Sequence, residues 1–180
     1  MLPPLQMKKL SEARALDAVL RLKTEHACEI REKYETRAKP CSECSAPGAC
    51  CLDAHFVNVE ITRLEAVAVR NALSEMEPEL RNRVYDRVGK AIINFGLDRA
   101  GNGSGRTFAC PLYEKGMGCL VHSTAKPIPC IQHACYERQE DLPPDSLQYE
   151  RELEVERLNR QTYSDAPVWL PLPVAIMRTC

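Results

Sequence analysis

The sequence predicts a mainly α-helical fold with short β segments, built as one small domain around a cluster of cysteines. Three observations lead to this prediction. Apolar residues recur with the 3.6-residue period of amphipathic helices over several long segments. Eight of the ten cysteines lie in two blocks. The length of 180 residues, with 44% hydrophobic and 27% charged content, is typical of a globular chain of one domain.

The N-terminal segment, residues 1–39, is expected to hold an amphipathic helix from Ser11 to about Thr36. Its apolar residues share one side of a 3.6-residue helix: Leu16, Val19, Leu20, Ala27, Ile30 and Tyr34. Cys28 projects more than a quarter-turn from the centre of this stripe, so we leave it out of any site. Lys39-Pro40 should end the helix, because proline disfavours helical geometry in the residue before it.

A helical insert is expected at residues 62–97, after a short half-buried strand at residues 57–61. Thr62 and Glu65 have the spacing of a capping box, which predicts a helix from Thr62 to about Met76. Pro78 suits the first turn of a second helix, and Gly96 offers its C-terminal stop. The apolar residues of this second helix recur at near i, i+4 spacing: Leu80, Val84, Val88, Ile92 and Phe95.

The rest of the chain is expected to combine loops, short segments and one more long helix. The glycine-rich stretch 98–106 lacks Gly-Lys-Ser/Thr, which favours a flexible loop over a phosphate loop. Residues 118–122 are expected to form a short strand and residues 131–139 a helix. The C-terminal segment, residues 141–180, should form a charged helix from Ser146 to about Tyr163. Its apolar, proline-rich tail should pack extended on the same domain, with Trp169 as the anchor.

The cysteines form two blocks on either side of the helical insert. The eight candidate ligands are Cys41, Cys44, Cys50 and Cys51 in the first block, and Cys110, Cys119, Cys130 and Cys135 in the second. A thiolate metal site needs soft ligands from separate parts of the chain. Residues 40–140 are therefore expected to be a metal-binding domain in which the metal contributes to folding. Ligand softness suits zinc and iron equally, and iron would be held as an ion or as an iron–sulfur cluster.

The number of centres depends on the doublet Cys50-Cys51. If that stretch is extended, successive side chains point to opposite faces and the two thiolates do not bind one ion easily. The eight thiolates then form either two neighbouring centres, or one centre of four ligands with further thiols around it. His122 and His133 lie in the second block. The sequence leaves three roles open for them: metal ligands, hydrogen-bond donors to the ligands, or ordinary polar residues. Enough sulfur is present without them, and Cys180 at the chain end is treated as a bystander.

Charge and terminal sequence limit the partners that we expect. The formal net charge of -1 gives no general electrostatic reason to expect nucleic acid or an anionic membrane as partner. The N-terminus lacks the apolar core of a secretory signal, and no apolar run is long enough to span a bilayer. We therefore expect a cytoplasmic location, where clustered thiols bind metal more often than they form disulfides. No hydrolytic motif stands out.

The combined pattern resembles the YkgJ-type cysteine-cluster family, whose members are described as zinc- or iron-chelating proteins. The family shows Cys-x2-Cys, a short gap and Cys-Cys, then a strand and helix, then Cys-Pro, Cys and an Arg-Pro-led segment with more cysteine. The matching residues, within residues 40–136, are Cys41, Cys44, Cys50, Cys51, Cys110-Pro111, Cys119, Cys130 and Cys135. The chain departs from this pattern in having Lys126-Pro127 for Arg-Pro, His122 for an aromatic residue and Ile131 for arginine.

The resemblance implies metal chelation and offers one enzymatic alternative. The family includes a bacterial flagellin lysine N-methylase linked to an iron–sulfur cluster, and other members are labelled iron–sulfur oxidoreductases. The alternative function is therefore that of an iron–sulfur-cluster-dependent enzyme, either an oxidoreductase or similar to a protein N-methylase. No catalytic residue is assigned, and whether the chain is an enzyme is left open.

Overall fold

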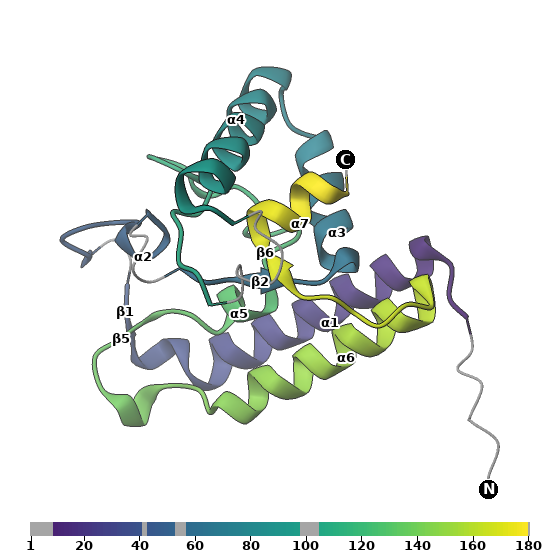
Figure 1. Cartoon of the computed structure of the whole chain (residues 1–180). Helices are drawn as coiled ribbons and strands as arrows, with labels where there is room; N and C mark the ends of the chain where they lie inside the picture. Colours follow the sequence, from purple (N-terminus) through teal and green to yellow (C-terminus); the bar gives the residue numbers. More distant parts are fainter. Residues whose placement is uncertain (1–8, 41–42, 53–56, 98–104, 180) are drawn as a thin grey trace, which may run out of the picture.

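Two long helices, α1 (Glu12–Lys33) and α6 (Asp145–Tyr163), lie side by side and antiparallel in the computed structural model (Figure 1). The structure describes residues 9–40, 43–52, 57–97 and 105–179. Both ends of the pair are joined by polar contacts: the Tyr163 hydroxyl donates to Glu12 at 2.7 Å, and Arg151 pairs with Glu29 at 3.2 Å. The chain is a small, mainly helical domain with short strands, as the sequence predicts.

Helix α1 begins as predicted, with Ser11 as its N-cap, but its buried face differs from the predicted stripe. The buried residues are Ala15, Val19, Leu22, Lys23, His26 and Ile30. Leu20, placed in the stripe by the sequence pattern, is 38% exposed, so that assignment is wrong. Cys28 is exposed, as expected. The helix ends before Lys39-Pro40, and the chain continues through a 3-10 turn, η1 (Glu35–Arg37).

The helical insert has the predicted boundaries to within two residues. Helix α3 (Arg63–Ser74) has Thr62 as its N-cap: the Glu65 N–H donates to Thr62 Oγ1 and the Thr62 N–H to Glu65 Oε2, which completes the capping box. Helix α4 (Pro78–Phe95) ends at Gly96, which has the left-handed φ of 59° that glycine adopts without a steric penalty.

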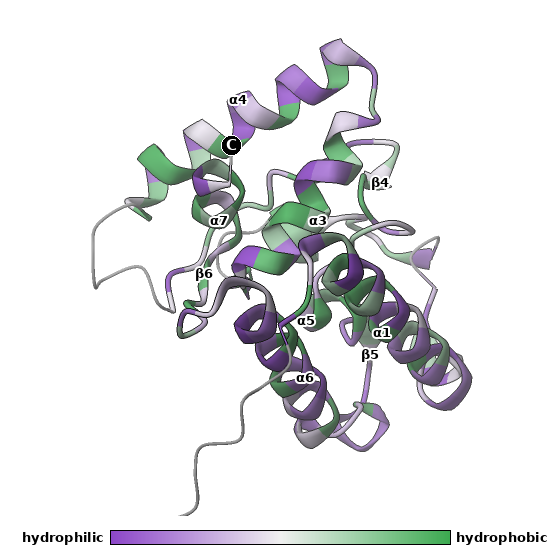
Figure 2. Ribbon diagram, turned by 90° about the vertical axis from the view of Figure 1, so that its right-hand side faces the viewer, coloured by the Kyte–Doolittle hydropathy of each residue, from purple (hydrophilic) through white to green (hydrophobic). Residues whose placement is uncertain are grey.

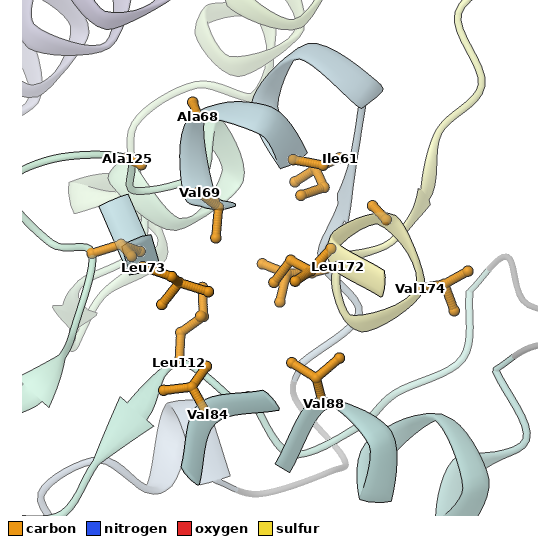
Figure 3. Close-up of a cluster of buried hydrophobic side chains, with 14 of the residues drawn as sticks. Ile61, Ala68, Val69, Leu73, Val84, Val88, Leu112, Ala125, Leu172 and Val174 are labelled. Atoms are coloured by element: carbon orange, nitrogen blue, oxygen red, sulfur yellow. The ribbon is translucent and has the colours of Figure 1, made fainter. Parts of the chain in front are cut away.

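The C-terminal tail forms a strand and a helix, so the expectation of a wholly extended tail is wrong. Strand β6 (Leu170–Pro171) pairs antiparallel with β2 (Glu60–Ile61), and α7 (Leu172–Arg178) follows directly. Helix α7 packs against α3 and α4, and Figure 3 shows Leu172 directed toward the side chains of this core. The Trp169 indole N–H donates to Glu156 on α6 at 2.7 Å, so this residue does anchor the tail.

Two further antiparallel strand pairs hold the second cysteine block. Strand β1 (Ala38–Lys39) pairs with β5 (Cys135–Tyr136), and β3 (Tyr113–Glu114) pairs with β4 (Gly118–Cys119). The short helices α2 (Ala49–Leu52) and α5 (Ile128–Ile131) and the 3-10 turn η3 (Gln139–Asp141) complete the described elements. The predicted helix at 131–139 is wrong, because α5 ends where it was expected to begin and Cys135 lies in a strand. The strands predicted at 57–61 and 118–122 are present only at 60–61 and 118–119.

The hydropathy of the ribbon separates the outer helices from the core. Figure 2 shows mainly hydrophilic residues along α1 and α6, and hydrophobic residues where α3 and α7 lie in the interior. Within the described ranges, no helix combines the length and the apolar character that crossing a bilayer requires.

Candidate metal centre

The backbones of the two cysteine blocks meet in the fold. In the first block, Cys50 and Cys51 lie on α2. The Cys110 N–H, from the second block, donates to the Cys51 carbonyl oxygen at 2.7 Å. The other members of the second block sit on separate short elements: Cys119 on β4, Cys130 on α5 and Cys135 on β5. The chain therefore leaves this point at Cys51 and returns to it at Cys110, with 58 residues in between that include the helical insert.

Five of the candidate thiols influence one another and are called the thiol cluster below: Cys50, Cys51, Cys110, Cys119 and Cys130. Burial raises the pKa of the Cys51 thiol to about 12, with contributions from Cys110 and Cys50. Cys50 also hydrogen-bonds to Cys51. Burial likewise raises the pKa of Cys130 well above its ordinary value, and the neighbouring Cys110 and Cys119 act in the same direction. The thiolate forms of Cys51 and Cys130 are disfavoured because they are poorly solvated and repelled by other sulfurs.

Backbone N–H groups partly offset this effect by donating hydrogen bonds to sulfur. Burial raises the pKa of Cys110 to about 12, although hydrogen bonds from the backbone of Leu112 and Tyr113 lower it. Burial also raises the pKa of Cys119, and a backbone hydrogen bond from Val121 opposes the rise. Hydrogen bonds of this kind orient sulfur ligands and stabilise their negative charge in thiolate metal sites.

Tyr113 on β3 holds the first block against the second. Its hydroxyl donates to the Pro47 carbonyl oxygen at 3.3 Å, and its ring covers Gly48. A Cβ atom at Gly48 would lie 2.1 Å from Tyr113 Cζ, and the φ of Gly48 is +85°. Only glycine meets both conditions without strain, so Gly48 lets the turn before Cys50 pass beneath the tyrosine.

Helix α4 holds the other side of the hairpin formed by β3 and β4. The Arg87 guanidinium donates to the Pro111 carbonyl oxygen at 2.9 Å and to Glu114 at 2.7 Å. Glu114 also pairs with Arg83 at 3.6 Å. The arginine pair lowers the pKa of Glu114, so its carboxylate stays charged. The insert therefore supports the β3–β4 hairpin that carries Cys119.

Some of the predicted ligands are not placed in the thiol cluster. Cys41 lies outside the described residues, as does the bystander Cys180. Cys44 is half-buried. Cys135 is half-buried opposite Lys39 in the β1–β5 pair. His122 and His133 are exposed.

The condition that set the expected number of centres does not hold, because Cys50 and Cys51 belong to a helical turn rather than an extended stretch. Successive residues on a helix project about 100° apart, which leaves the two thiols close enough to form a hydrogen bond with each other. The geometric argument against a shared ion therefore no longer applies.

The donor chemistry fits zinc or iron, but the side chains do not form a closed coordination sphere. All five members of the thiol cluster are free thiols. Nevertheless, no three histidine, cysteine or acidic side chains among the described residues are arranged to hold a metal ion. Coordination by the thiol cluster would require its side chains to rotate toward one point.

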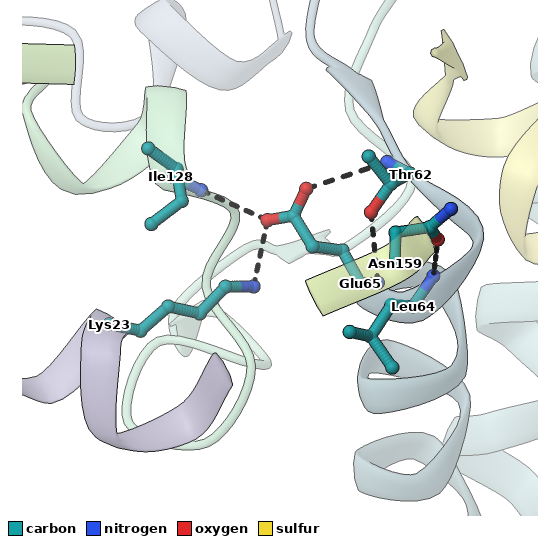
Figure 4. Close-up of polar contacts among 6 residues, drawn as sticks. All are labelled: Lys23, Thr62, Leu64, Glu65, Ile128 and Asn159. Carbon is teal, nitrogen blue, oxygen red and sulfur yellow. Dashed lines mark hydrogen bonds and ion pairs between the residues drawn. The ribbon is translucent and has the colours of Figure 1, made fainter. Parts of the chain in front are cut away.

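Sequence reasoning missed a second role for Glu65. Besides capping α3, its buried carboxylate pairs with the buried Lys23 Nζ of α1 at 2.9 Å and accepts from the Ile128 N–H of α5 at 3.4 Å (Figure 4). It thereby joins three helices beside Cys130. The signal was Lys23 itself: it lies four residues after Val19 and four before Ala27, on the apolar face of α1, where a lysine must be paired.

The chain matches no family model, and no curated protein or solved structure is similar enough to indicate a relationship. The YkgJ-type resemblance therefore stays a prediction.

Proposed function

We propose that this protein is a metal-binding cysteine-cluster protein that holds zinc or iron with thiolates from both sequence blocks. The observation that carries the proposal is the meeting of the blocks: the Cys110 N–H donates to the Cys51 carbonyl oxygen, and the thiols of the two residues interact electrostatically. A fold that brings together cysteines from two distant parts of the chain provides what a soft metal needs. A reducing compartment such as the cytoplasm is the setting in which these thiols would stay available.

Metal binding would also reverse the electrostatics of the thiol cluster. Without a cation, the thiolate forms of Cys51 and Cys130 are disfavoured by burial and by their sulfur neighbours. A divalent ion replaces this repulsion by attraction, and the thiols release protons as they coordinate it. Rotation of the side chains toward the ion would then link α2, β4 and α5, so binding would stabilise the fold.

The test is elemental analysis together with an absorption spectrum on protein prepared without oxygen. We expect zinc or iron in a whole-number ratio to the chain. Cys119→Ser should lose most of the metal, whereas the matched control Cys28→Ser, which removes an exposed thiol outside the cluster, should retain it. Metal-free wild-type protein that is fully reduced, or full metal content in Cys119→Ser, would contradict the proposal.

The same sample decides which metal is bound and whether it supports the fold. Colourless protein with zinc indicates a structural site. Iron with acid-labile sulfide and visible absorption would instead favour the iron–sulfur enzyme. In either case a strong chelator should lower the melting temperature of the wild type, because metal binding contributes to the folding free energy.

A further inference from the structure

A cleft of about 620 Å³ lies between α1 and the segment that leads into α5. From α1 and η1 it is lined by Leu20, Lys23, Thr24, Ala27, Cys28, Arg31 and Glu35, and from the opposite segment by His122, Ser123, Thr124, Lys126 and Ile131. This volume is within the range of about 300–1,000 Å³ typical of small-molecule sites. None of the lining residues belongs to the thiol cluster.

The charges on the wall of the cleft are mainly positive. Arg31 comes from α1 and Lys126 from the opposite side, and no carboxylate in the described ranges forms an ion pair with either of them. Among the described residues of the lining, Glu35 is the single acidic one. Lys23 contributes only its aliphatic chain, because its Nζ is buried against Glu65. Two cations facing one carboxylate leave the cleft with an excess of positive charge.

The cleft also offers hydroxyl groups and an apolar surface. Ser123 and Thr124 are exposed beside Lys126 and can donate hydrogen bonds to oxygen atoms of a ligand. Leu20, whose side chain is 38% exposed although it is a large aliphatic residue of α1, lines the same cleft. Ala27 and Ile131 extend this surface. A ligand that satisfies the whole wall therefore has an anionic head and a short apolar body.

We propose that this cleft binds a small organic anion, with its carboxylate or phosphate group between Arg31 and Lys126 and its aliphatic part on Leu20, Ala27 and Ile131. Arginine recognises carboxylate and phosphate groups by donating two parallel N–H bonds to two of their oxygen atoms, and lysine adds a flexible positive charge. The binding site is separate from the proposed metal centre, and its occupancy is measured without reference to metal.

The test is to titrate the protein as purified with hexanoate, hexyl phosphate and hexanol, and to monitor binding by two-dimensional amide NMR. We expect the two anions to shift the amides of Thr24, Ala27, Ser123 and Thr124 with millimolar dissociation constants. Hexanol, which has the same chain without the charge, should bind at least about threefold more weakly, because a partly exposed charge contributes modestly to affinity. Comparison of the two anions identifies the preferred head group.

Charge-removing variants make the assignment specific. Arg31→Gln and Lys126→Gln should each weaken hexanoate binding about three- to tenfold, and the double variant should weaken it further. The matched control Arg21→Gln removes an exposed cation of the same helix that does not line the cleft, and it should leave the affinity unchanged. The proposal is overturned if these amides do not shift, if hexanol binds as well as hexanoate, or if Arg21→Gln weakens binding as much as Arg31→Gln.

Discussion

Replacing Gly48 by alanine should separate the first cysteine block from Tyr113. The new methyl group would occupy space 2.1 Å from the Tyr113 ring, so the ring must swing away and lose its hydrogen bond to Pro47. The φ of +85° is also unfavourable for alanine. The two costs are separate, because one is a contact between distant residues and the other is local backbone strain.

The expected loss of stability follows from these two contributions. A left-handed backbone costs an L-residue about 1–2 kcal/mol. Forcing an extra methyl group against a packed side chain, here the Tyr113 ring, costs about 1–3 kcal/mol. Gly48→Ala should therefore lower the free energy of unfolding by about 2–5 kcal/mol, a large part of the stability of a domain of this size.

A matched variant isolates the contact with Tyr113. Gly116 has a similar φ of +83°, but a Cβ atom there would meet nothing within 4 Å. Urea unfolding followed by circular dichroism should show Gly48→Ala to be less stable than Gly116→Ala by about 1–3 kcal/mol. Combining Gly48→Ala with Tyr113→Ala should remove that excess. Equal losses in the two glycine variants would refute the argument that Tyr113 holds the turn.

Two further predictions concern Lys23 and His26, the buried polar residues of α1, and Glu65 of α3, which pairs with Lys23. Glu65→Gln should destabilise the protein by about 3–5 kcal/mol in the same assay, because it leaves the Lys23 ammonium buried without a counter-charge. The double variant Glu65→Gln/Lys23→Met should recover part of the loss, and equal stability of the single and double variants would contradict this reasoning. His26 is fully buried, and burial, followed by the charge of Arg151, lowers its pKa below the ordinary 6.5 against the opposing effect of Glu29. Below pH 6.5 the unfolded chain takes up a proton that folded His26 does not. Stability should therefore fall by up to about 1.4 kcal/mol per pH unit from that pH down to the folded pKa, and this slope should be absent in His26→Leu.

Local signals account for the elements that sequence reasoning placed well. The capping box at Thr62 and the left-handed Gly96 are formed by residues within one helical turn, so the ends of α3 and α4 can be recognised without knowing what packs on them. Helix α1 was recognisable from the period of its apolar residues, and α6 from its charged sequence, which are also local signals. The orientation of α1 was less predictable. Leu20, which was expected in the buried stripe, is exposed, and His26, which was not part of that stripe, is buried where α6 and α3 pack against the helix.

Elements that depend on distant partners could not be predicted in this way. Cys135 was expected on a helix, but its backbone pairs with Lys39, almost one hundred residues earlier. The proline-rich tail forms α7 because Leu172 and its neighbours complete a core between α3 and α4. In both segments a long-range contact outweighed the weak local preference of a short stretch of chain.

The sequence by itself determined the ends of the helical insert and supplied the thiols as two separate blocks, because caps and cysteine spacing are properties of the local chain. Only the tertiary structure decided that Cys110 would lie against Cys51, and that Glu65 would join Lys23 to α5. Such contacts form only after the intervening chain has packed, since burial of the whole core stabilises a geometry that no local segment can specify.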